Sequence, residues 1–419
     1  MTQLCEIAGS VADLTITGNP NYHGRPFTDF HVVGPSTDIR SLNLNWRERD
    51  LPEKQRTKHV HRLHPYLGKF VPQLVEIFLR KYLQSGDTVF DPFCGSGTTV
   101  VQANELGVNS IGFDVSAFNV LLTRAKVARY DVNQVRREVH GILERTRLAT
   151  QKRVQLPFDF AGLAGEPNVP LPQTDDEYLG MWFAPRAKRE LLTYRELIES
   201  GGYEHEDLLK VILSRSARSA RLTTHFELDF PKRPQTEPYY CHKHSRQCSP
   251  TTQAFKFLER YSLDALDRIG RFAELRTDAA ALVEHADSRE AQIPPIDGII
   301  TSPPYVGLID YHDQHAYAYH LLSLEDRREA EIGPAANGSG QKARTAYVEG
   351  IVQVFDNAIR SLKQGGRIIV VAADRHNLYP QISRLLGVET EAIISRHVNR
   401  RTGRRATNFF ESVFVWRKA

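Results

Sequence analysis

A glycine-rich turn between a short strand and a helix constrains the fold of this chain more than any other feature. Thr88–Phe90 is strand-like, Cys94–Gly97 forms the turn, a helical pattern runs from about Thr98 to Leu106, and Ser110–Phe113 is again strand-like. Strands joined through a helix become parallel neighbours with a right-handed crossover. The sequence therefore predicts an α/β fold built on a mostly parallel sheet.

The same pattern continues in the C-terminal part of the chain. Apolar residues at helical spacing also predict a helix before the first strand, from Phe70 to Tyr82. Further strands are predicted at Ala281–His285, Gly298–Thr301 and Arg367–Ala373, with a closing antiparallel hairpin from Glu391–Arg396 to Phe410–Trp416. The small polar segment Gly333–Lys342 is predicted to be a loop.

A largely helical region separates the two groups of strands. Helices are predicted at about 132–148, 184–199, 206–221 and 253–273. This pattern divides the chain into an N-terminal arm (1–60), a sheet-forming domain made of two segments (61–130 and 281–419), and an inserted helical domain (131–280).

Composition mainly excludes classes of protein. No uninterrupted apolar run approaches the roughly 18 residues of a membrane-spanning helix, and Met1–Ser10 lacks the features of a secretory signal. Four cysteines in 419 residues do not suggest a disulfide framework. We therefore expect a cytoplasmic protein that does not enter a membrane.

Basic side chains cluster locally although the net charge is only +4. One run holds Arg47, Arg49, Lys54, Arg56, Lys58 and Arg62, and another holds Arg396, His397, Arg400, Arg401, Arg404 and Arg405. A predicted helix carries Arg215, Arg218 and Arg221. Each cluster fits either phosphate contacts or a solvated surface, and both interpretations stay open here.

The glycine turn has the features of a nucleotide-type binding site. Gly95 and Gly97 let the backbone approach a ligand closely, Asp91 at the strand end can receive a positive group, and Asp114 ends the next strand where a carboxylate reaches ribose hydroxyls. Val100 replaces the third glycine of the dinucleotide fingerprint, and no Gly-Lys-Ser/Thr follows. The pattern indicates an adenosine-containing ligand without a pyrophosphate.

The tetrapeptide Ser302-Pro303-Pro304-Tyr305 follows the apolar strand. Consecutive prolines remove backbone donors and free their carbonyls from the sheet. The Ser302 hydroxyl and the Pro303 carbonyl can hold the hydrogens of an exocyclic amine, and Tyr305 can stack on a base taken out of a duplex. The chain has no Pro-Cys pair, which excludes the cysteine nucleophile of cytosine-C5 chemistry.

These segments resemble the S-adenosylmethionine-dependent DNA amino-methyltransferases. Asp91–Thr99 is similar to their motif I, His64–Pro72 to the segment before it, and Ser302–Tyr305 to their catalytic motif IV. The resemblance implies a Rossmann-like methyltransferase fold with a seven-stranded sheet, and S-adenosylmethionine as cofactor. It implies cofactor contacts from Phe70, Pro72, Asp91, Phe93, Cys94, Gly95, Ser96, Gly97, Thr98, Asp114 and Asp287, the last being the acid that closes over the adenine.

The resemblance also implies the reaction. Serine at position 302 is typical of enzymes that methylate N4 of cytosine, so we expect a site-specific methyltransferase acting on double-stranded DNA, with residues 131–280 recognising the target. Adenine-N6 methylation of DNA and guanine-N2 methylation of RNA are the alternatives. The enzyme would act with a cognate restriction endonuclease or as a solitary methyltransferase.

The segment Cys241–Cys248 contains four side chains that can bind zinc. Its spacing differs from the usual paired Cys-x2-Cys and His-x3-His arrangements. We therefore favour a packing or DNA-facing segment here and expect no bound metal.

Overall fold

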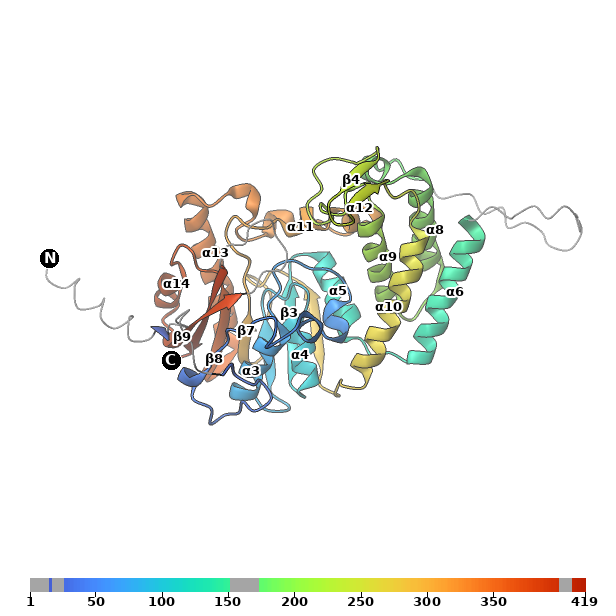
Figure 1. Cartoon of the computed structure of the whole chain (residues 1–419). Helices are drawn as coiled ribbons and strands as arrows, with labels where there is room; N and C mark the ends of the chain where they lie inside the picture. The colour runs from blue at the N-terminus through green and yellow to red at the C-terminus, as the bar shows by residue number, and fades with distance from the viewer. Residues whose placement is uncertain (1–14, 17–25, 151–172, 399–408) are drawn as a thin grey trace, which may run out of the picture.

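An eight-stranded sheet forms the centre of the molecule (Figure 1). The computed structural model describes residues 15–16, 26–150, 173–398 and 409–419. The strand order is β1-β9-β10-β8-β7-β2-β3-β6. The strands are β1 (Thr15–Ile16), β2 (Thr88–Asp91), β3 (Asn109–Asp114), β6 (Ala281–His285), β7 (Ile296–Thr301), β8 (Leu362–Ala372), β9 (Glu389–Val398) and β10 (Phe409–Arg417).

The predicted sheet is confirmed. Strands β6, β3, β2, β7 and β8 run parallel to one another, and β10 lies antiparallel to both β8 and β9. The two-residue β1 adds an eighth strand by pairing with β9. The predicted Gly333–Lys342 loop is partly wrong, because α13 begins at Gln341 and Ala335–Asn337 form a short 3-10 helix.

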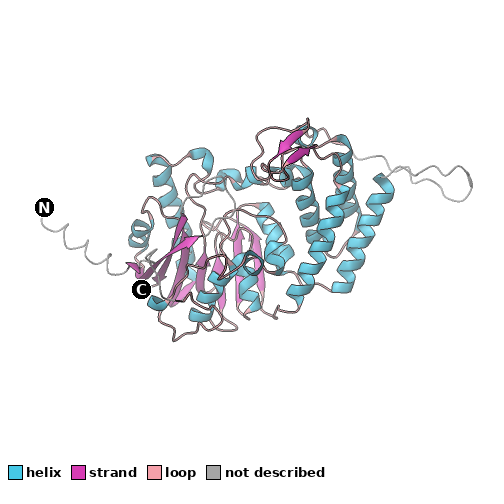
Figure 2. Cartoon of the chain, viewed as in Figure 1, coloured by secondary structure: helices cyan, strands magenta, loops and turns pink. Residues whose placement is uncertain are grey.

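Helices cover both faces of the sheet (Figure 2). They include α3 (Pro72–Tyr82), α4 (Thr98–Glu105), α5 (Ala117–Val127), α13 (Gln341–Ser361) and α14 (Tyr379–Leu386). Neighbouring strand residues point to opposite faces: Ile369 and Val371 pack in one core with α3, whereas Ile368 and Val370 pack in another with α13. The sheet is thus buried on both sides, which explains its continuous apolar runs.

A group of helices lies beyond the β6 edge of the sheet (Figure 1). Its members are α6 (Val132–Thr150), α7 (Glu177–Trp182), α8 (Pro185–Gly201), α9 (Glu206–Ala220) and α10 (Phe255–Ala273). The four helices predicted here occur within two residues of their expected ends. One continuous core joins them to Val100 of α4 and Phe118 of α5. The division of the chain into domains stays a prediction.

Short elements complete the described chain. They are η1 (Ile39–Ser41), α2 (Glu53–Arg56), η2 (His59–Arg62), the hairpin β4 (Tyr239–Cys241) and β5 (Arg246–Cys248), α11 (Tyr311–Gln314), α12 (Ala316–Leu322), η3 (Arg328–Ala330) and η4 (Ala335–Asn337). Among the described residues, no helix combines the length and apolar character needed to cross a bilayer.

Candidate active site

The glycine turn and the Ser-Pro-Pro-Tyr segment lie side by side. They follow β2 and β7, which are adjacent parallel strands, so both turns emerge at the same edge of the sheet. The Thr301 hydroxyl donates a hydrogen bond of 2.6 Å to the Asp91 carboxylate and ties the two strand ends together. The chain continues from β2 toward β3 on one side and from β7 toward β8 on the other, which opens a crevice between the two loops.

A pocket that encloses about 820 Å³, open solvent included, occupies this crevice. Both turns contribute to its wall. Of the residues predicted to form the site, those that line the cavity are Phe70, Phe93, Cys94, Gly95, Ser96, Thr98, Asp114, Asp287, Ser302 and Pro304. The predicted residues that do not line it are Pro72, Asp91, Gly97, Pro303 and Tyr305.

The turn between β2 and α4 requires glycine. Gly97 caps the helix with a φ of 76°, and a Cβ there would lie 2.6 Å from the Thr123 methyl carbon. Gly95 has a φ of 51° and its N–H donates to Asp114 over 2.7 Å. The turn therefore leaves its backbone close to the cavity without an intervening side chain.

Asp91 lies fully buried behind the turn. One carboxylate oxygen accepts hydrogen bonds from Thr301 and from the backbone N–H of Phe93. The other oxygen has no partner among the described residues. Burial raises the pKa of Asp91 to about 6. A buried carboxylate oxygen without a donor is costly, so this position suits a ligand group that is positively charged or donates a hydrogen bond.

Asp114 joins β3 to the glycine turn. Its carboxylate accepts hydrogen bonds from the N–H groups of Gly95 (2.7 Å) and Ser116 (2.8 Å) and from the Asn119 amide (3.1 Å). A carboxylate has about four lone-pair sites, so Asp114 retains capacity for one further donor, such as a ligand hydroxyl.

Asp287 lines the cavity but is engaged by a residue that sequence reasoning missed. Both of its oxygens accept from the Arg289 guanidinium, at 2.9 Å and 3.0 Å from Nε. The neighbouring Ser288 hydroxyl donates to the Pro92 carbonyl over 2.8 Å and ties this loop to the glycine turn. Arg289 thereby holds the Asp287 carboxylate in place at the cavity wall.

The Ser-Pro-Pro-Tyr segment is fixed by hydrogen bonds to three other elements. The Ser302 hydroxyl donates to the Val371 carbonyl of β8 over 2.9 Å. The Pro304 carbonyl accepts from the Tyr347 hydroxyl of α13 over 2.9 Å, and the Tyr305 hydroxyl donates to Glu411 of β10 over 2.9 Å. Because the hydrogen of Ser302 is committed to β8, its oxygen lone pairs are left to accept.

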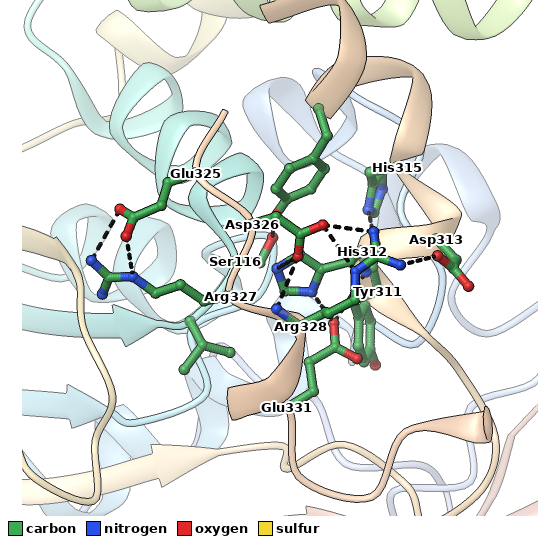
Figure 3. A network of polar contacts seen from close by, with 12 residues as sticks. Ser116, Tyr311, His312, Asp313, His315, Glu325, Asp326, Arg327, Arg328 and Glu331 are labelled. Atoms are coloured by element: carbon green, nitrogen blue, oxygen red, sulfur yellow. Dashed lines mark hydrogen bonds and ion pairs between the residues drawn. The ribbon is translucent and has the colours of Figure 1, made fainter. Parts of the chain in front are cut away.

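Further residues complete the cavity wall. The Tyr66 and Tyr311 rings stack 5.7 Å apart, and both line the cavity. The mixed aromatic and polar residues after Tyr305 predict pocket lining by Asp310, Tyr311 and His312, and of these Tyr311 lines the cavity. Glu331, which carried no sequence signal, also lines it and accepts from the backbone and ring of His312 (Figure 3).

The basic clusters are largely paired internally. Arg396 is 4% exposed and pairs with Glu411, which corrects its interpretation as a phosphate-binding side chain. Arg400, Arg401, Arg404 and Arg405 lie outside the described residues. The N-terminal run forms ion pairs that join Arg47 and Arg49 to Asp50, Arg56 to Glu48 and Lys58 to Glu105.

The three arginines of α9 are neither solvated nor free. Arg215 pairs with Asp264 and Arg218 with Asp229. Arg221 lies over the Tyr317 ring at 4.5 Å and donates to the Leu228 carbonyl. These arginines hold α9 against its neighbours. The two interpretations of their spacing, a solvated surface and a set of phosphate contacts, are therefore both wrong.

Comparisons with known proteins identify a relative that matches most of the chain. The family described as DNA methylase matches residues 21–123. The type II methyltransferase M.MjaII of Methanocaldococcus jannaschii is 36% identical over 430 residues, which cover 87% of this chain and 81% of that protein. The tRNA (guanine(10)-N2)-dimethyltransferase of the same organism is 29% identical over 118 residues, covering 25% of this chain and 33% of that protein. Among solved structures, the rRNA methyltransferase aviRa of Streptomyces viridochromogenes matches with a TM-score of 0.32 and 13% identity, over 89% of this chain and 96% of that one.

Proposed function

Because this chain belongs to the N4/N6 family of S-adenosylmethionine-dependent DNA amino-methyltransferases, we propose that it methylates N4 of cytosine in double-stranded DNA. The observation that carries the proposal is Ser302. Its hydroxyl hydrogen is committed to the Val371 carbonyl and the residue lines the cavity, so the oxygen lone pairs remain available to accept. Serine at this position is typical of the cytosine-N4 enzymes that the sequence resembles.

The cofactor half of the cavity is assigned to the first two strand ends. S-adenosylmethionine supplies a methyl group activated by a positively charged sulfonium. The unpartnered oxygen of Asp91 supports a role in receiving the ammonium group of its methionine end. The remaining acceptor capacity of Asp114 supports a hydrogen bond from a ribose hydroxyl. The Gly95–Gly97 backbone fits between these two contacts.

The substrate half is assigned to the Ser-Pro-Pro-Tyr segment. Base flipping brings the exocyclic amine out of the duplex and into the cavity. The Ser302 oxygen, with the Pro303 carbonyl, accepts the amine hydrogens and turns the nitrogen lone pair toward the methyl group. The bound cofactor would supply the methyl group, so that an N–C bond to the amine would replace the S–C bond of the sulfonium, and the nitrogen would lose one proton to solvent. The protein would accelerate methyl transfer by positioning the amine and by directing dipoles at the charge that develops on it.

Methylome sequencing in a host without DNA methylation tests the proposal. Expression of the chain is expected to produce N4-methylcytosine at one short sequence, and digestion of that DNA to nucleosides identifies the base. N6-methyladenine in its place would overturn the choice of base while keeping the family. Methylation of transfer RNA in competition with duplex DNA would overturn the choice of nucleic acid.

Target recognition and partnership remain part of the proposal. The described helices between α6 and α10 lie beyond the β6 edge of the sheet, and we assign the reading of the DNA sequence to residues 131–280. The match to a type II methyltransferase supports pairing with a cognate restriction endonuclease. Survival of cells that express that endonuclease only when this chain is present would test the pairing.

A further inference from the structure

Four side chains with metal-binding atoms converge at the β4–β5 hairpin. Cys241 lies on β4 and Cys248 on β5, and His244 lies in the turn between them. The fourth, His225, comes from the loop that follows α9 and lies sixteen residues before Cys241. The hairpin, labelled β4 at the top of Figure 1, forms a two-stranded sheet separate from the central one.

The distances match the edges of a metal-centred tetrahedron. Cys241 Sγ lies 3.5 Å from His225 Nδ1 and 3.6 Å from His244 Nδ1, and Cys248 Sγ lies 3.6 Å from His244 Nδ1. All four ligand atoms lie within 4.8 Å of one another. Zinc–sulfur bonds of about 2.3 Å and zinc–nitrogen bonds of about 2.0–2.1 Å in a tetrahedron separate S and N by roughly 3.6 Å.

The surrounding segment is held by polar contacts and contributes no residue to the described hydrophobic clusters. The described hydrophobic clusters include Ala220 and Ala254 but no residue between them. Phe226, Phe230 and Tyr240 are all more than half exposed. A segment of this length without a core of its own is commonly stabilised by disulfides or a metal, and Cys241 and Cys248 are both free.

We propose that His225, Cys241, His244 and Cys248 bind one Zn²⁺ ion that fixes the β4–β5 hairpin to the loop after α9. Two thiolates and two imidazoles are a donor set that favours zinc over magnesium or calcium. Each thiol releases one proton on binding, and the two thiolates then balance the charge of the ion. Four protein ligands leave no open position, so the site is structural.

The fourth ligand explains why the sequence favoured the opposite interpretation. Residues 241–248 alone give a crowded set of candidates, of which His242 does not belong to the cluster. His225 belongs to it only because the loop folds back, helped by a hydrogen bond of 3.2 Å from its N–H to the Tyr239 hydroxyl. That hydroxyl also lies 2.8 Å from His225 Nδ1, a hydrogen bond that the ring nitrogen would exchange for the metal in our proposal.

Metal analysis of the purified full-length chain tests the site. The wild-type protein is expected to contain about one zinc per chain, and Cys248→Ser and His244→Ala are expected to lose it. His244 is exposed and Cys248 is half-buried, so these substitutions remove a ligand without creating a cavity in the hydrophobic core. His242→Ala is the matched control on the same turn and is expected to retain zinc. A wild-type chain that stays metal-free after incubation with zinc, or a Cys248→Ser chain that retains zinc, would overturn the proposal.

Cobalt substitution tests the ligand set separately from stability. Co²⁺ added to the zinc-free chain is expected to give the visible absorption of a tetrahedral site with thiolate ligands, and zinc is expected to displace it. A spectrum typical of octahedral, water-rich cobalt would contradict the assignment. Limited proteolysis should show faster cleavage between Ala220 and Ala254 after chelation, in the wild type and in His242→Ala alike.

Discussion

At the scale of single residues, the site depends on the hydrogen bonds that a few polar atoms already make within the protein before any ligand binds. The Ser302 hydrogen is given to Val371, the Tyr305 hydrogen to Glu411, and one oxygen of Asp91 is satisfied while the other is not. Each of these hydrogen bonds determines which atom remains available to bind a ligand. Substitutions at these residues should therefore affect separate steps.

Ser302→Ala is expected to lower kcat by about 10²-fold or more, because it removes an acceptor that positions the amine. The Kd for S-adenosylmethionine should stay within about twofold, since Ser302 lies on the substrate half of the cavity. Single-turnover methylation and calorimetric cofactor binding measure the two quantities. A variant that transfers at the wild-type rate would rule out this role for the hydroxyl.

Tyr305 separates the contribution of its ring from that of its hydroxyl. The hydroxyl donates to Glu411, so its part is to hold the ring, which the sequence predicts to stack on the base. Tyr305→Ala is expected to abolish transfer, whereas Tyr305→Phe should retain activity within about tenfold. Loss of activity to the same extent in both variants would show that the hydroxyl, not the ring, is required.

Asp91 is expected to give opposite pH dependences to stability and to cofactor binding. Burial raises its pKa to about 6 from the 3.8 of an ordinary aspartate. Between these values the folded chain holds a proton that the unfolded chain has lost, so this group makes the protein less stable as pH rises from about 4 to about 6. Cofactor affinity should instead fall below pH 6, by up to about tenfold per pH unit, as the carboxylate is protonated.

Asp91→Asn should remove both dependences at once. Urea unfolding and calorimetric titration of S-adenosylmethionine between pH 5 and pH 8 measure them. Binding that is strong and independent of pH in both proteins would mean that the carboxylate does not meet a cation.

At the scale of elements, the order and type of most strands and helices were predictable from local pattern. The turn glycines, the apolar strands and the helices of residues 132–273 carry their information in neighbouring residues. The contacts of Glu411 with Arg396 and Tyr305 could not be read this way, because these partners lie 15 and 106 residues away in the sequence. The proposed zinc ligand His225 could not be predicted for the same reason, because it lies sixteen residues before Cys241.

At the scale of elements, the testable prediction concerns Gly97, which caps the start of α4. Gly97→Ala is expected to destabilise the chain by about 2 kcal/mol, because a left-handed residue with a Cβ is strained and here also meets Thr123. Gly270→Ala is the control within α10, where a Cβ would contact nothing within 4 Å and should be neutral or stabilising by up to about 1 kcal/mol. Urea denaturation of both variants gives the comparison.

At the scale of the whole molecule, the helical region and the sheet share one core. The cluster that holds Trp182 of α7 also includes residues of α4, α5 and β6, whereas Trp416 is buried on the other side of the sheet. Helices anchored in this way cannot lose their packing without exposing a face of α5. We therefore expect the two regions to unfold cooperatively.

Tryptophan fluorescence can follow each region separately. With Trp46 replaced by Phe, further substitution of Trp416 leaves Trp182 as the reporter, and substitution of Trp182 leaves Trp416. The two proteins are expected to show coincident urea midpoints after correction for the stability of each variant. A transition at Trp182 that precedes the one at Trp416 would instead show an independent helical domain.

The hydrogen bond between Thr301 and Asp91 also has a consequence for biosynthesis. It joins positions 210 residues apart, and β2 gains its neighbour β7 only when that later segment has been made. At about 5–20 residues per second, one edge of β2 stays unpaired on the ribosome for roughly 10–40 s. An open strand edge invites association with other nascent chains, so the yield of native protein should respond to chaperone supply and to growth temperature.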